Sequence, residues 1–221
     1  MRINKFVARA TGLSRRAADA AIQNGRVTIN QRTAALGDNI DDGDTVNLDG
    51  QPIIAAGSRT VMLNKPAGYV CSRDGQGGRT IYELLPLEYH RLKPVGRLDK
   101  DSSGLLLLTD DGDLANRLAH PRYAKAKVYE ISLGQPLAPN DRSRLDKGIS
   151  VEDYVSRLQL KPLGSQSWQV TMSQGRNRQI RRTFAALGYD VKALHRTAFG
   201  PYQLSDLPLG QYHICDAEEG L

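Results

Sequence analysis

An uncharged stretch at residues 50–58 separates two parts of this 221-residue chain that carry their charges differently. Residues 1–32 hold seven basic residues and one aspartate, a net charge of +6, whereas residues 33–58 hold five aspartates and no basic residue. The remainder mixes 23 basic with 18 acidic side chains. Because a chain of this length suits one or two domains, the sequence predicts a small domain over residues 1–49, a linker over 50–58 and a larger domain over 59–221.

The overall composition is that of a folded globular protein. Hydrophobic residues make up 40% of the chain and charged residues 24%, which argues against disorder. Apolar runs reach only four residues, as in Leu105–Leu108, which excludes a membrane-spanning helix. The net charge of +6 is compatible with a nucleic-acid partner without requiring one.

The two cysteines, Cys71 and Cys215, belong to no CxxC motif. This usage excludes a disulfide framework and a zinc-finger module, and it favours a reducing, cytoplasmic location. A single long-range disulfide is the alternative for the cysteines, and an organellar presequence is the alternative for the Arg-rich N-terminus. Glycines at positions 12 and 25 stand where folded helices would end, which favours a folded N-terminal segment.

The first 49 residues have the pattern of two short helices and a hairpin. Gly12 can end a helix over residues 3–9, and Ser14 can cap a second helix over residues 15–23. Strand-like alternation follows at residues 26–29 and 45–48. The alanines of the second helix are available for packing, so the double arginine at its start is expected to point outward.

This segment, KFVARATGLSRRAADAAIQNGRVTIN, resembles the RNA-binding module first described in ribosomal protein S4. The shared features are a short helix, the SRR helix start, a glycine stop and the pattern G-x-V-x-I-N. Gln31 departs from the family, whose hairpin usually has glycine after the asparagine. The resemblance implies RNA contacts by four basic residues: Lys5, Arg9, Arg15 and Arg16.

The larger domain shows strands with interspersed short helices rather than strict strand–helix alternation, which indicates a mixed α+β sheet domain. Strands are expected at residues 60–63, 105–109, 127–133, 157–160 and 168–172, and helices at residues 80–83, 113–120, 140–147 and 177–187.

Two constellations of this domain can carry chemistry. A charged, glycine-bounded loop at residues 95–105 lies directly against an apolar strand, a place where functional sites are common. Residues 175–182 put four arginines at a helix start, where the helix dipole favours acids, so this segment is expected to face anions. The simpler alternatives are a surface turn and a solvated basic helix face. The four histidines show no ligand spacing, so no metal site is expected.

Four segments, LNKPAG (63–68), GRLDKDSSGLLLLTDDG (96–112), KVYEISL (127–133) and GRNRQIRR (175–182), occur in the order found in the pseudouridine synthases of the small-subunit-type (RsuA-like) rRNA branch. The whole chain resembles this family. The resemblance implies a mainly antiparallel sheet flanked by short helices, no cofactor, and Asp99 as the catalytic carboxylate. It implies that Arg181 pairs with Asp99 and favours its ionised form, and that Tyr129 stacks on the uracil or moves a proton.

The same resemblance assigns the remaining site residues to RNA. Arg97 would fill the gap that a flipped nucleotide leaves in the RNA stack, and Ile180 would form an apolar wall for the uracil. Further substrate or RNA contacts are expected from Lys65, Arg178 and Arg182.

The sequence therefore predicts isomerisation of uridine to pseudouridine in ribosomal RNA. The segments NRQIRR and PLGQY are most similar to members that act on the large subunit. The alternatives are the same chemistry on small-subunit rRNA or tRNA, and a non-catalytic RNA-binding assembly factor. A monomer acting on rRNA or a pre-ribosomal particle is expected, and the covalent route of the aspartate is left open.

Overall fold

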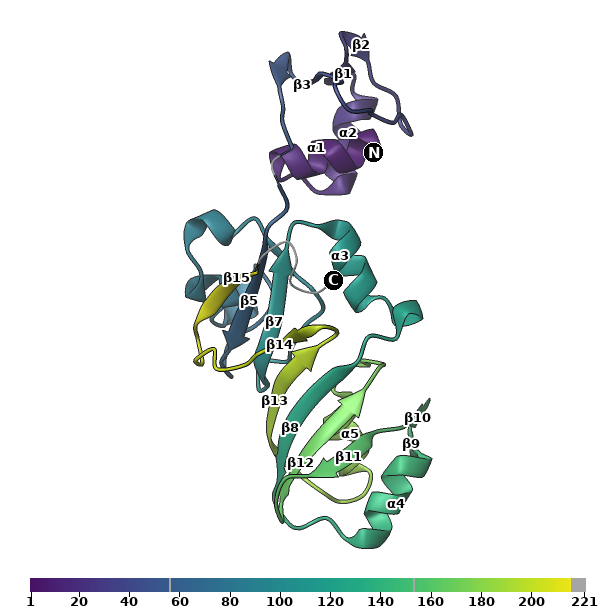
Figure 1. Cartoon of the computed structure of the whole chain (residues 1–221), viewed down its shortest axis with the longest axis vertical. Coiled ribbons are helices and arrows are strands. Elements are labelled where there is room, and N and C mark those ends of the chain that lie inside the picture. The colour runs from purple at the N-terminus through teal and green to yellow at the C-terminus, as the bar shows by residue number, and fades with distance from the viewer. Residues whose placement is uncertain (56, 153, 216–221) are drawn as a thin grey trace. The chain divides into compact units, whose positions relative to one another are not determined.

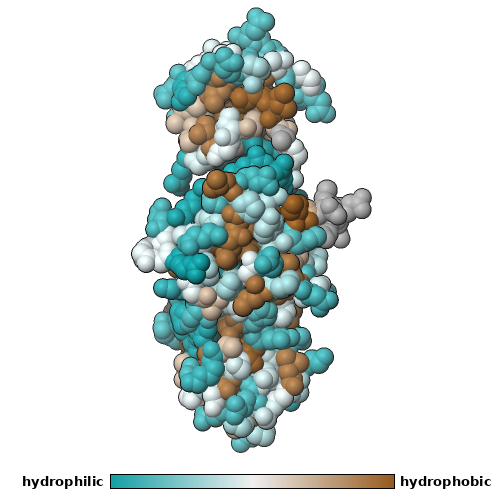
Figure 2. Space-filling model, turned by 90° about the vertical axis from the view of Figure 1, so that its left-hand side faces the viewer, coloured by the Kyte–Doolittle hydropathy of each residue, from teal (hydrophilic) through white to brown (hydrophobic). Residues whose placement is uncertain are grey.

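The computed structural model describes the chain except for residues 56, 153 and 216–221 (Figure 1). The fold divides into two compact units, Met1–Ser58 and Arg59–Leu221, and each has its own hydrophobic core. No helix in the described part of the chain has the length and apolar character needed to cross a membrane. Figure 2 shows apolar side chains as small patches separated by hydrophilic residues, the usual pattern of a globular surface.

The N-terminal unit packs two helices on a small antiparallel sheet. Gly12 ends the first helix in a left-handed conformation (φ 78°), and the Ser14 hydroxyl accepts from the Ala17 amide to start the second, as the sequence predicts. Gln31 also has a positive φ of 69°, a conformation that glycine adopts more readily than other residues. The elements are α1 (Ile3–Thr11), α2 (Arg15–Gln23), β1 (Val27–Ile29), β2 (Arg32–Thr33), β3 (Val46–Leu48) and β4 (Gln51–Pro52), with sheet order β2-β1-β3-β4.

The expected linker over residues 50–58 is partly structured, which corrects its boundary. Strand β4 pairs with β3 through Gln51 and Pro52, and Ile53 packs on the N-terminal core. The segment therefore belongs in part to the first unit.

The second unit is built on a mixed sheet in the order β11-β12-β8-β13-β7-β5-β15. Its pairs are antiparallel except for β13 with β7, which run parallel. This is the α+β architecture that the sequence predicts. The strands are β5 (Thr60–Lys65), β6 (Lys93–Pro94), β7 (Ser103–Thr109), β8 (Lys127–Leu133), β9 (Ile149–Val151), β10 (Tyr154–Ser156), β11 (Gln159–Pro162), β12 (Ser167–Met172), β13 (Val191–Phe199), β14 (Tyr202–Gln203) and β15 (Tyr212–Cys215).

Strand β7 is the centre of this unit because both of its faces are buried. Leu106 and Leu108 belong to one apolar cluster, and Leu105 and Leu107 belong to another. Alternate side chains of a strand point to opposite faces, so this run of four leucines supplies both cores. The loop that precedes the strand is thereby anchored on a fixed element.

Short helices flank the sheet. Asp111 caps α3 by accepting from the amides of Asp113 and Leu114. The predicted helix over residues 177–187 is shorter, and Arg178 is left-handed (φ 48°) just before it. The helices are α3 (Gly112–Ala119), α4 (Pro139–Lys147) and α5 (Gln179–Ala185), with 3₁₀ turns η1 (Gly75–Gly77), η2 (Ile81–Leu84), η3 (Leu87–Tyr89) and η4 (Pro121–Tyr123).

Candidate active site

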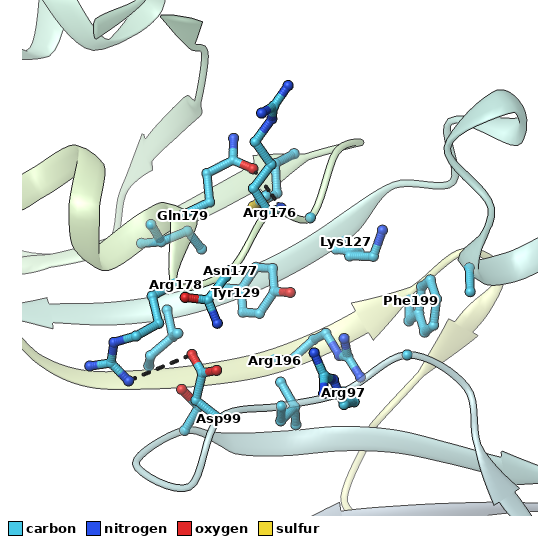
Figure 3. A pocket seen from close by; sticks show the side chains of 18 of the residues that line it. Arg97, Asp99, Lys127, Tyr129, Arg176, Asn177, Arg178, Gln179, Arg196 and Phe199 are labelled. Atoms are coloured by element: carbon cyan, nitrogen blue, oxygen red, sulfur yellow. Dashed lines mark hydrogen bonds and ion pairs between the residues drawn. The ribbon is translucent and has the colours of Figure 1, made fainter. Parts of the chain in front are cut away.

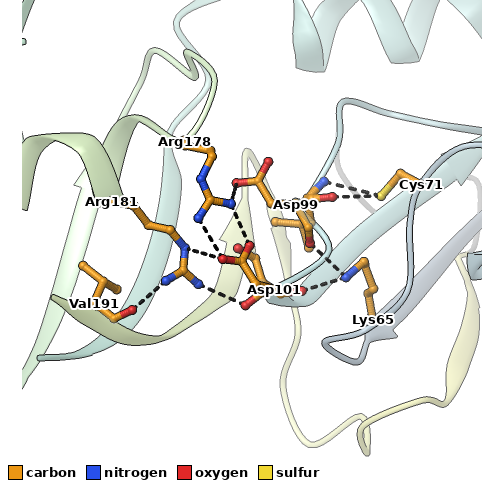
Figure 4. Close-up of polar contacts among 9 residues, drawn as sticks. Lys65, Cys71, Asp99, Asp101, Arg178, Arg181 and Val191 are labelled. Carbon is orange, nitrogen blue, oxygen red and sulfur yellow. Dashed lines mark hydrogen bonds and ion pairs between the residues drawn. The ribbon is translucent and has the colours of Figure 1, made fainter. Parts of the chain in front are cut away.

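A buried lysine binds the backbone of the loop between β6 and β7. Lys65 has no exposed surface, and its Nζ donates to the carbonyls of Pro66 (2.9 Å), Asp99 (3.1 Å) and Ser102 (2.7 Å) (Figure 4). Burial lowers the pKa of Lys65, and the nearby Cys71, Asp101 and Asp99 act in the opposite direction. The expectation that Lys65 contacts RNA is therefore wrong, because its side chain faces the interior and fixes the backbone of the loop.

A buried cysteine makes a second attachment to the same loop. The Cys71 thiol lies 3.3 Å from the Leu98 carbonyl and 3.5 Å from the Leu98 amide. Burial raises the pKa of Cys71, so the thiol keeps its proton and can donate to that carbonyl. Cys71 and Cys215 are not joined in a disulfide, so the disulfide alternative is not formed. Together Lys65 and Cys71 fix the backbone on both sides of Asp99.

Arg178, and not Arg181, is the guanidinium nearest to Asp99. The Asp99 carboxylate is about one third exposed and lies 3.8 Å from Arg178 Nη1. Arg178 donates two hydrogen bonds of 2.9 Å to Asp101, and Arg181 Nε lies 3.2 Å from the same carboxylate. The hydrogen bonds from Arg178 lower the pKa of Asp101. The predicted Asp99–Arg181 pair is thus replaced by a clamp of two arginines on Asp101 (Figure 4).

The clamp follows from the turn that precedes α5. The buried Gln179 side chain accepts from the Arg176 amide and donates to the Ser156 hydroxyl, which closes the turn and leaves Arg178 left-handed. Arg178 then faces the loop of Asp99. Arg181 donates to the carbonyls of Asp101 and Val191, so it joins the loop to β13.

A pocket of about 310 Å³ opens beside Asp99 (Figure 3). This volume is in the range of small-molecule sites. Five cationic side chains and one carboxylate, that of Asp99, line it among the described residues, so the pocket suits a ligand with several negative charges. The lining residues are Gly96, Arg97, Leu98, Asp99, Ser102, Ala119, Pro121, Lys127, Tyr129, Met172, Ser173, Gly175, Arg176, Asn177, Arg178, Gln179, Ile180, Leu194, Arg196 and Phe199.

The pocket gathers most of the catalytic-domain residues singled out from the sequence: Arg97, Asp99, Tyr129, Arg178 and Ile180. Lys65, Arg181 and Arg182 lie outside its lining. Arg182 forms an ion pair with Glu152 and lies over the Tyr154 ring, so it faces away from Asp99.

Sequence reasoning missed several lining residues, among them Lys127, Arg196 and Phe199. Arg196 and Phe199 lie in a strand, Val191–Phe199, that the sequence analysis does not predict. In the N-terminal unit, Arg15 and Arg16 are exposed, while Lys5 and Arg9 are half-buried. The described residues contain no cluster of His, Cys, Asp and Glu that could hold a metal ion.

Comparison with known proteins identifies this arrangement. Residues 59–186 match the model of RNA pseudouridylate synthases, and residues 1–46 match that of the S4 domain. The chain belongs to the RNA pseudouridylate synthase family. It is therefore an RNA pseudouridine synthase with an N-terminal S4 domain, as the sequence motifs indicated.

Similar members of the family cover almost the whole chain. An uncharacterized RNA pseudouridine synthase of Aquifex aeolicus is 37% identical over 96% of this chain and 89% of its own length. Ribosomal large subunit pseudouridine synthase B of Pseudomonas aeruginosa is 38% identical over 99% of this chain and 60% of its own length. Ribosomal small subunit pseudouridine synthase A of Escherichia coli is 36% identical over 99% of this chain and 98% of its own length.

The fold agrees with this assignment. A crystal structure of a pseudouridylate synthase superposes with a TM-score of 0.70 and 32% identity, covering 99% of this chain and 97% of the other. The pseudouridine synthase fold and the enzyme class predicted from the sequence are confirmed.

Replacing Lys65 tests whether this lysine positions the loop that carries Asp99. In Lys65→Met the carbonyls of Pro66, Asp99 and Ser102 lose their shared donor, so the loop is free to shift. A shift of about 1 Å costs on the order of 10²-fold in rate. We expect the single-turnover rate on RNA to fall by about that factor while the RNA affinity stays within about twofold.

The matched control is Lys93→Met, which removes an exposed lysine of β6. Its rate should equal that of the unmodified enzyme, and thermal melting of both variants shows whether the fold persists. A folded Lys65→Met enzyme with full activity would contradict the positioning role.

Proposed function

We propose that this enzyme converts uridine to pseudouridine at one or a few sites of ribosomal RNA, that its target lies in the large subunit, and that Asp99 is the catalytic carboxylate. The observation that carries the proposal is the pocket, where Asp99 is the one carboxylate among five cationic side chains in the described lining. The names of the Pseudomonas and Escherichia relatives support ribosomal RNA. The similarity of the segments NRQIRR and PLGQY to family members that act on the large subunit supports a large-subunit target.

The reaction breaks the N1–C1′ bond of a uridine, rotates the uracil, and forms a C5–C1′ bond to the same ribose. The electron pair of the broken bond stays with the uracil, and the proton on C5 leaves after the new bond forms. An ionised carboxylate can attack the sugar or the base, or stabilise positive charge on the sugar. Asp99 supplies that group, and the guanidinium of Arg178 lies 3.8 Å from its carboxylate.

The other lining residues have complementary roles. Tyr129 is 8% exposed and Ile180 is 4% exposed, so both offer apolar surface to a uracil held within the pocket. The Tyr129 hydroxyl can also take or deliver the proton that C5 releases. Arg97 is exposed at the rim, where it can replace the flipped base in the RNA stack.

Arg181 acts through another residue instead of on the substrate. It lies 3.2 Å from Asp101 and donates to two carbonyls, so it fixes the loop that carries Asp99. Asp101 in turn orients Arg178 toward the pocket. Arg181 and Asp101 are therefore positioning residues, and Asp99 and Tyr129 are the catalytic residues of this proposal.

The S4 domain is proposed to add affinity for RNA without taking part in the chemistry. Arg15 and Arg16 are exposed at the start of α2, where they can contact phosphates. In the double variant Arg15→Gln/Arg16→Gln, the slope of log affinity against log salt should decrease by about 1.5 if both arginines contact phosphates. The rate at saturating RNA should not change. Filter binding at several salt concentrations and single-turnover kinetics measure the two quantities, and an unchanged salt slope would contradict a phosphate role for these arginines.

The choice among RNAs is tested directly. Unmodified large-subunit rRNA, small-subunit rRNA and tRNA are incubated separately with the enzyme, and pseudouridine is mapped by carbodiimide labelling and reverse transcription. We expect new reverse-transcription stops, which mark pseudouridine, in large-subunit rRNA alone. Stops confined to small-subunit rRNA or tRNA would move the target to that RNA. Binding to rRNA with no modification of any RNA would favour the non-catalytic assembly factor.

A further inference from the structure

Four side chains from two neighbouring strands share one face and form the floor of the pocket. Arg196 is paired across the strands with Tyr129, and Phe199 with Lys127. Directly paired residues of antiparallel strands point to the same face. The register shift between Arg196 and Ala198 places Arg196 and Phe199, which are three residues apart, on that common face. All four residues line the pocket (Figure 3).

Two of these side chains are cations that pack on one aromatic ring. Arg196 Cζ lies 4.9 Å from the centroid of the Phe199 ring, and Lys127 Nζ lies 5.1 Å from it. Phe199 is fully buried, so the ring is a fixed platform that offers cation–π contact to both groups. The bulge in β13 is what brings the two charges to the same ring.

The two charges have no acidic partner among the described residues. Arg196 is 1% exposed, its Nε donates to the Leu105 carbonyl at 2.7 Å, and its buried Nη2 has no hydrogen-bond acceptor. Lys127 Nζ has a single long contact of 3.4 Å to the Ser173 carbonyl. Burial lowers the pKa of Lys127, and the charge of Arg196 lowers it further. Such like charges are stabilised by an anion between them.

We propose that Lys127 and Arg196 form a subsite for the phosphodiester group next to the uridine that enters the pocket. This inference rests on the proposed function, because it assumes a nucleotide in the pocket. Lys127 and Tyr129 are two residues apart on β8, a distance of about 7 Å along the strand. A uracil against Tyr129 therefore leaves the adjoining phosphate within reach of Lys127. The subsite holds the nucleotide by its backbone while the uracil is detached from the ribose.

The source of the phosphate is tested with uncharged linkages. The RNA is a short oligonucleotide around the mapped uridine, prepared with a single methylphosphonate linkage on the 5′ or on the 3′ side of that uridine. Lys127→Gln is the main variant, and Lys161→Gln, an exposed lysine of β11, is its matched control. Affinities come from filter binding, and rates come from tritium release from 5-tritiated uridine.

We expect Lys127→Gln to bind the natural oligonucleotide about tenfold more weakly, the effect of one hydrogen bond to a charged group. One of the two methylphosphonates should weaken binding to the unmodified enzyme by a similar factor and should cause no further loss in Lys127→Gln. The linkage that shows this loss of additivity identifies the 5′ or the 3′ phosphate. The subsite would be overturned if the methylphosphonates weakened binding equally in both enzymes, or if Lys127→Gln bound the natural oligonucleotide as tightly as the unmodified enzyme does. Lys161→Gln should behave as the unmodified enzyme.

A second measurement does not depend on turnover or on the target site. Uridine 5′-monophosphate and uridine are titrated into the full-length enzyme and followed by NMR. If the 5′ phosphate is the ligand, the monophosphate binds about tenfold more tightly than uridine, and Lys127→Gln removes the preference. If the 3′ phosphate is the ligand instead, uridine 3′-monophosphate should bind about tenfold more tightly than uridine, and Lys127→Gln should remove that preference. Equal affinity for uridine and both monophosphates would reject the subsite even if the enzyme is active. Absence of Asp99-dependent tritium release from any RNA would reject the proposed function instead.

Arg196 is tested by the conservative change Arg196→Lys, because loss of the whole side chain could unfold the β7–β13 junction. Lysine keeps the charge and the length, but it cannot bind the Leu105 carbonyl and a phosphate through separate nitrogens. We expect a loss of preference for the monophosphate in a folded protein. A folded Arg196→Lys enzyme with full preference would restrict the proposed subsite to Lys127 and so contradict the role given to Arg196.

Discussion

Replacement of Asp99 by asparagine is expected to abolish pseudouridine formation while RNA binding persists. Asparagine has nearly the same shape as aspartate, but it carries no charge and is a poor nucleophile. The Asp99 side chain is about one third exposed, and its carboxylate lies 3.8 Å from Arg178, beyond hydrogen-bond distance. The backbone carbonyl of residue 99 accepts from Lys65, and that hydrogen bond remains in Asp99→Asn. Loss of a catalytic nucleophile costs at least about 10⁴-fold in rate.

The rate is measured by digesting the RNA to nucleosides and separating uridine from pseudouridine by chromatography. RNA affinity is measured in parallel by filter binding and should stay within about threefold. Asp146→Asn, an exposed aspartate of α4, is the matched control and should be fully active. An Asp99→Asn enzyme that works at a substantial rate would remove the carboxylate from the mechanism.

The second large effect is expected from Gly104→Ala at the parallel junction of β7 and β13. Gly104 has a φ of +104°, and a Cβ built on it would lie 2.3 Å from the Arg196 carbonyl oxygen and 2.4 Å from the Arg196 amide nitrogen. The Arg196 backbone is held in β13 by pairing with β8 on its other side. A Cβ at position 104 therefore forces β7 and β13 apart. Strained backbone and overpacking together cost about 3–5 kcal/mol, which lowers the melting temperature by about 10 °C or more in a protein of this size.

Thermal melting and soluble yield measure this effect. Gly112→Ala is the matched control, because Gly112 begins α3 with a negative φ and has open space where a Cβ would lie. That variant should melt at or slightly above the temperature of the unmodified protein. A Gly104→Ala protein with an unchanged melting temperature would show that the junction is more flexible than the structure indicates.

The parts of the fold that the sequence predicts are those with local signals. Gly12 and Ser14 determine where α1 ends and α2 begins, so both helices could be placed from the sequence alone. Strand β7 could be placed because four consecutive leucines require burial on both faces. Strand β13 was missed, since its two register shifts against β8 break the two-residue alternation. Strand β15 was missed as well, and it reaches β5 only through pairing distant in sequence.

The sequence likewise predicts the site only in part. The motifs identify Asp99, Tyr129 and Arg97 as pocket residues, but they do not say which arginine reaches which carboxylate. That choice depends on the left-handed Arg178 and on the Gln179 side chain that closes its turn. The burial of Lys65 likewise arises only when β5 pairs with β7 below the loop. A basic residue in a sequence motif can therefore hold the protein backbone in place, as Lys65 does, or contact RNA, and the motif alone does not distinguish the two roles.

The measurement that tests the proposed function most directly is tritium release from ribosomal RNA that carries 5-tritiated uridine. Formation of the C5–C1′ bond expels the hydrogen on C5, so each turnover releases one tritium to water. We expect release from unmodified large-subunit rRNA with the natural enzyme and none with Asp99→Asn. Release that is equal in the two enzymes, or no release from any ribosomal RNA, would contradict an Asp99-dependent rRNA pseudouridine synthase.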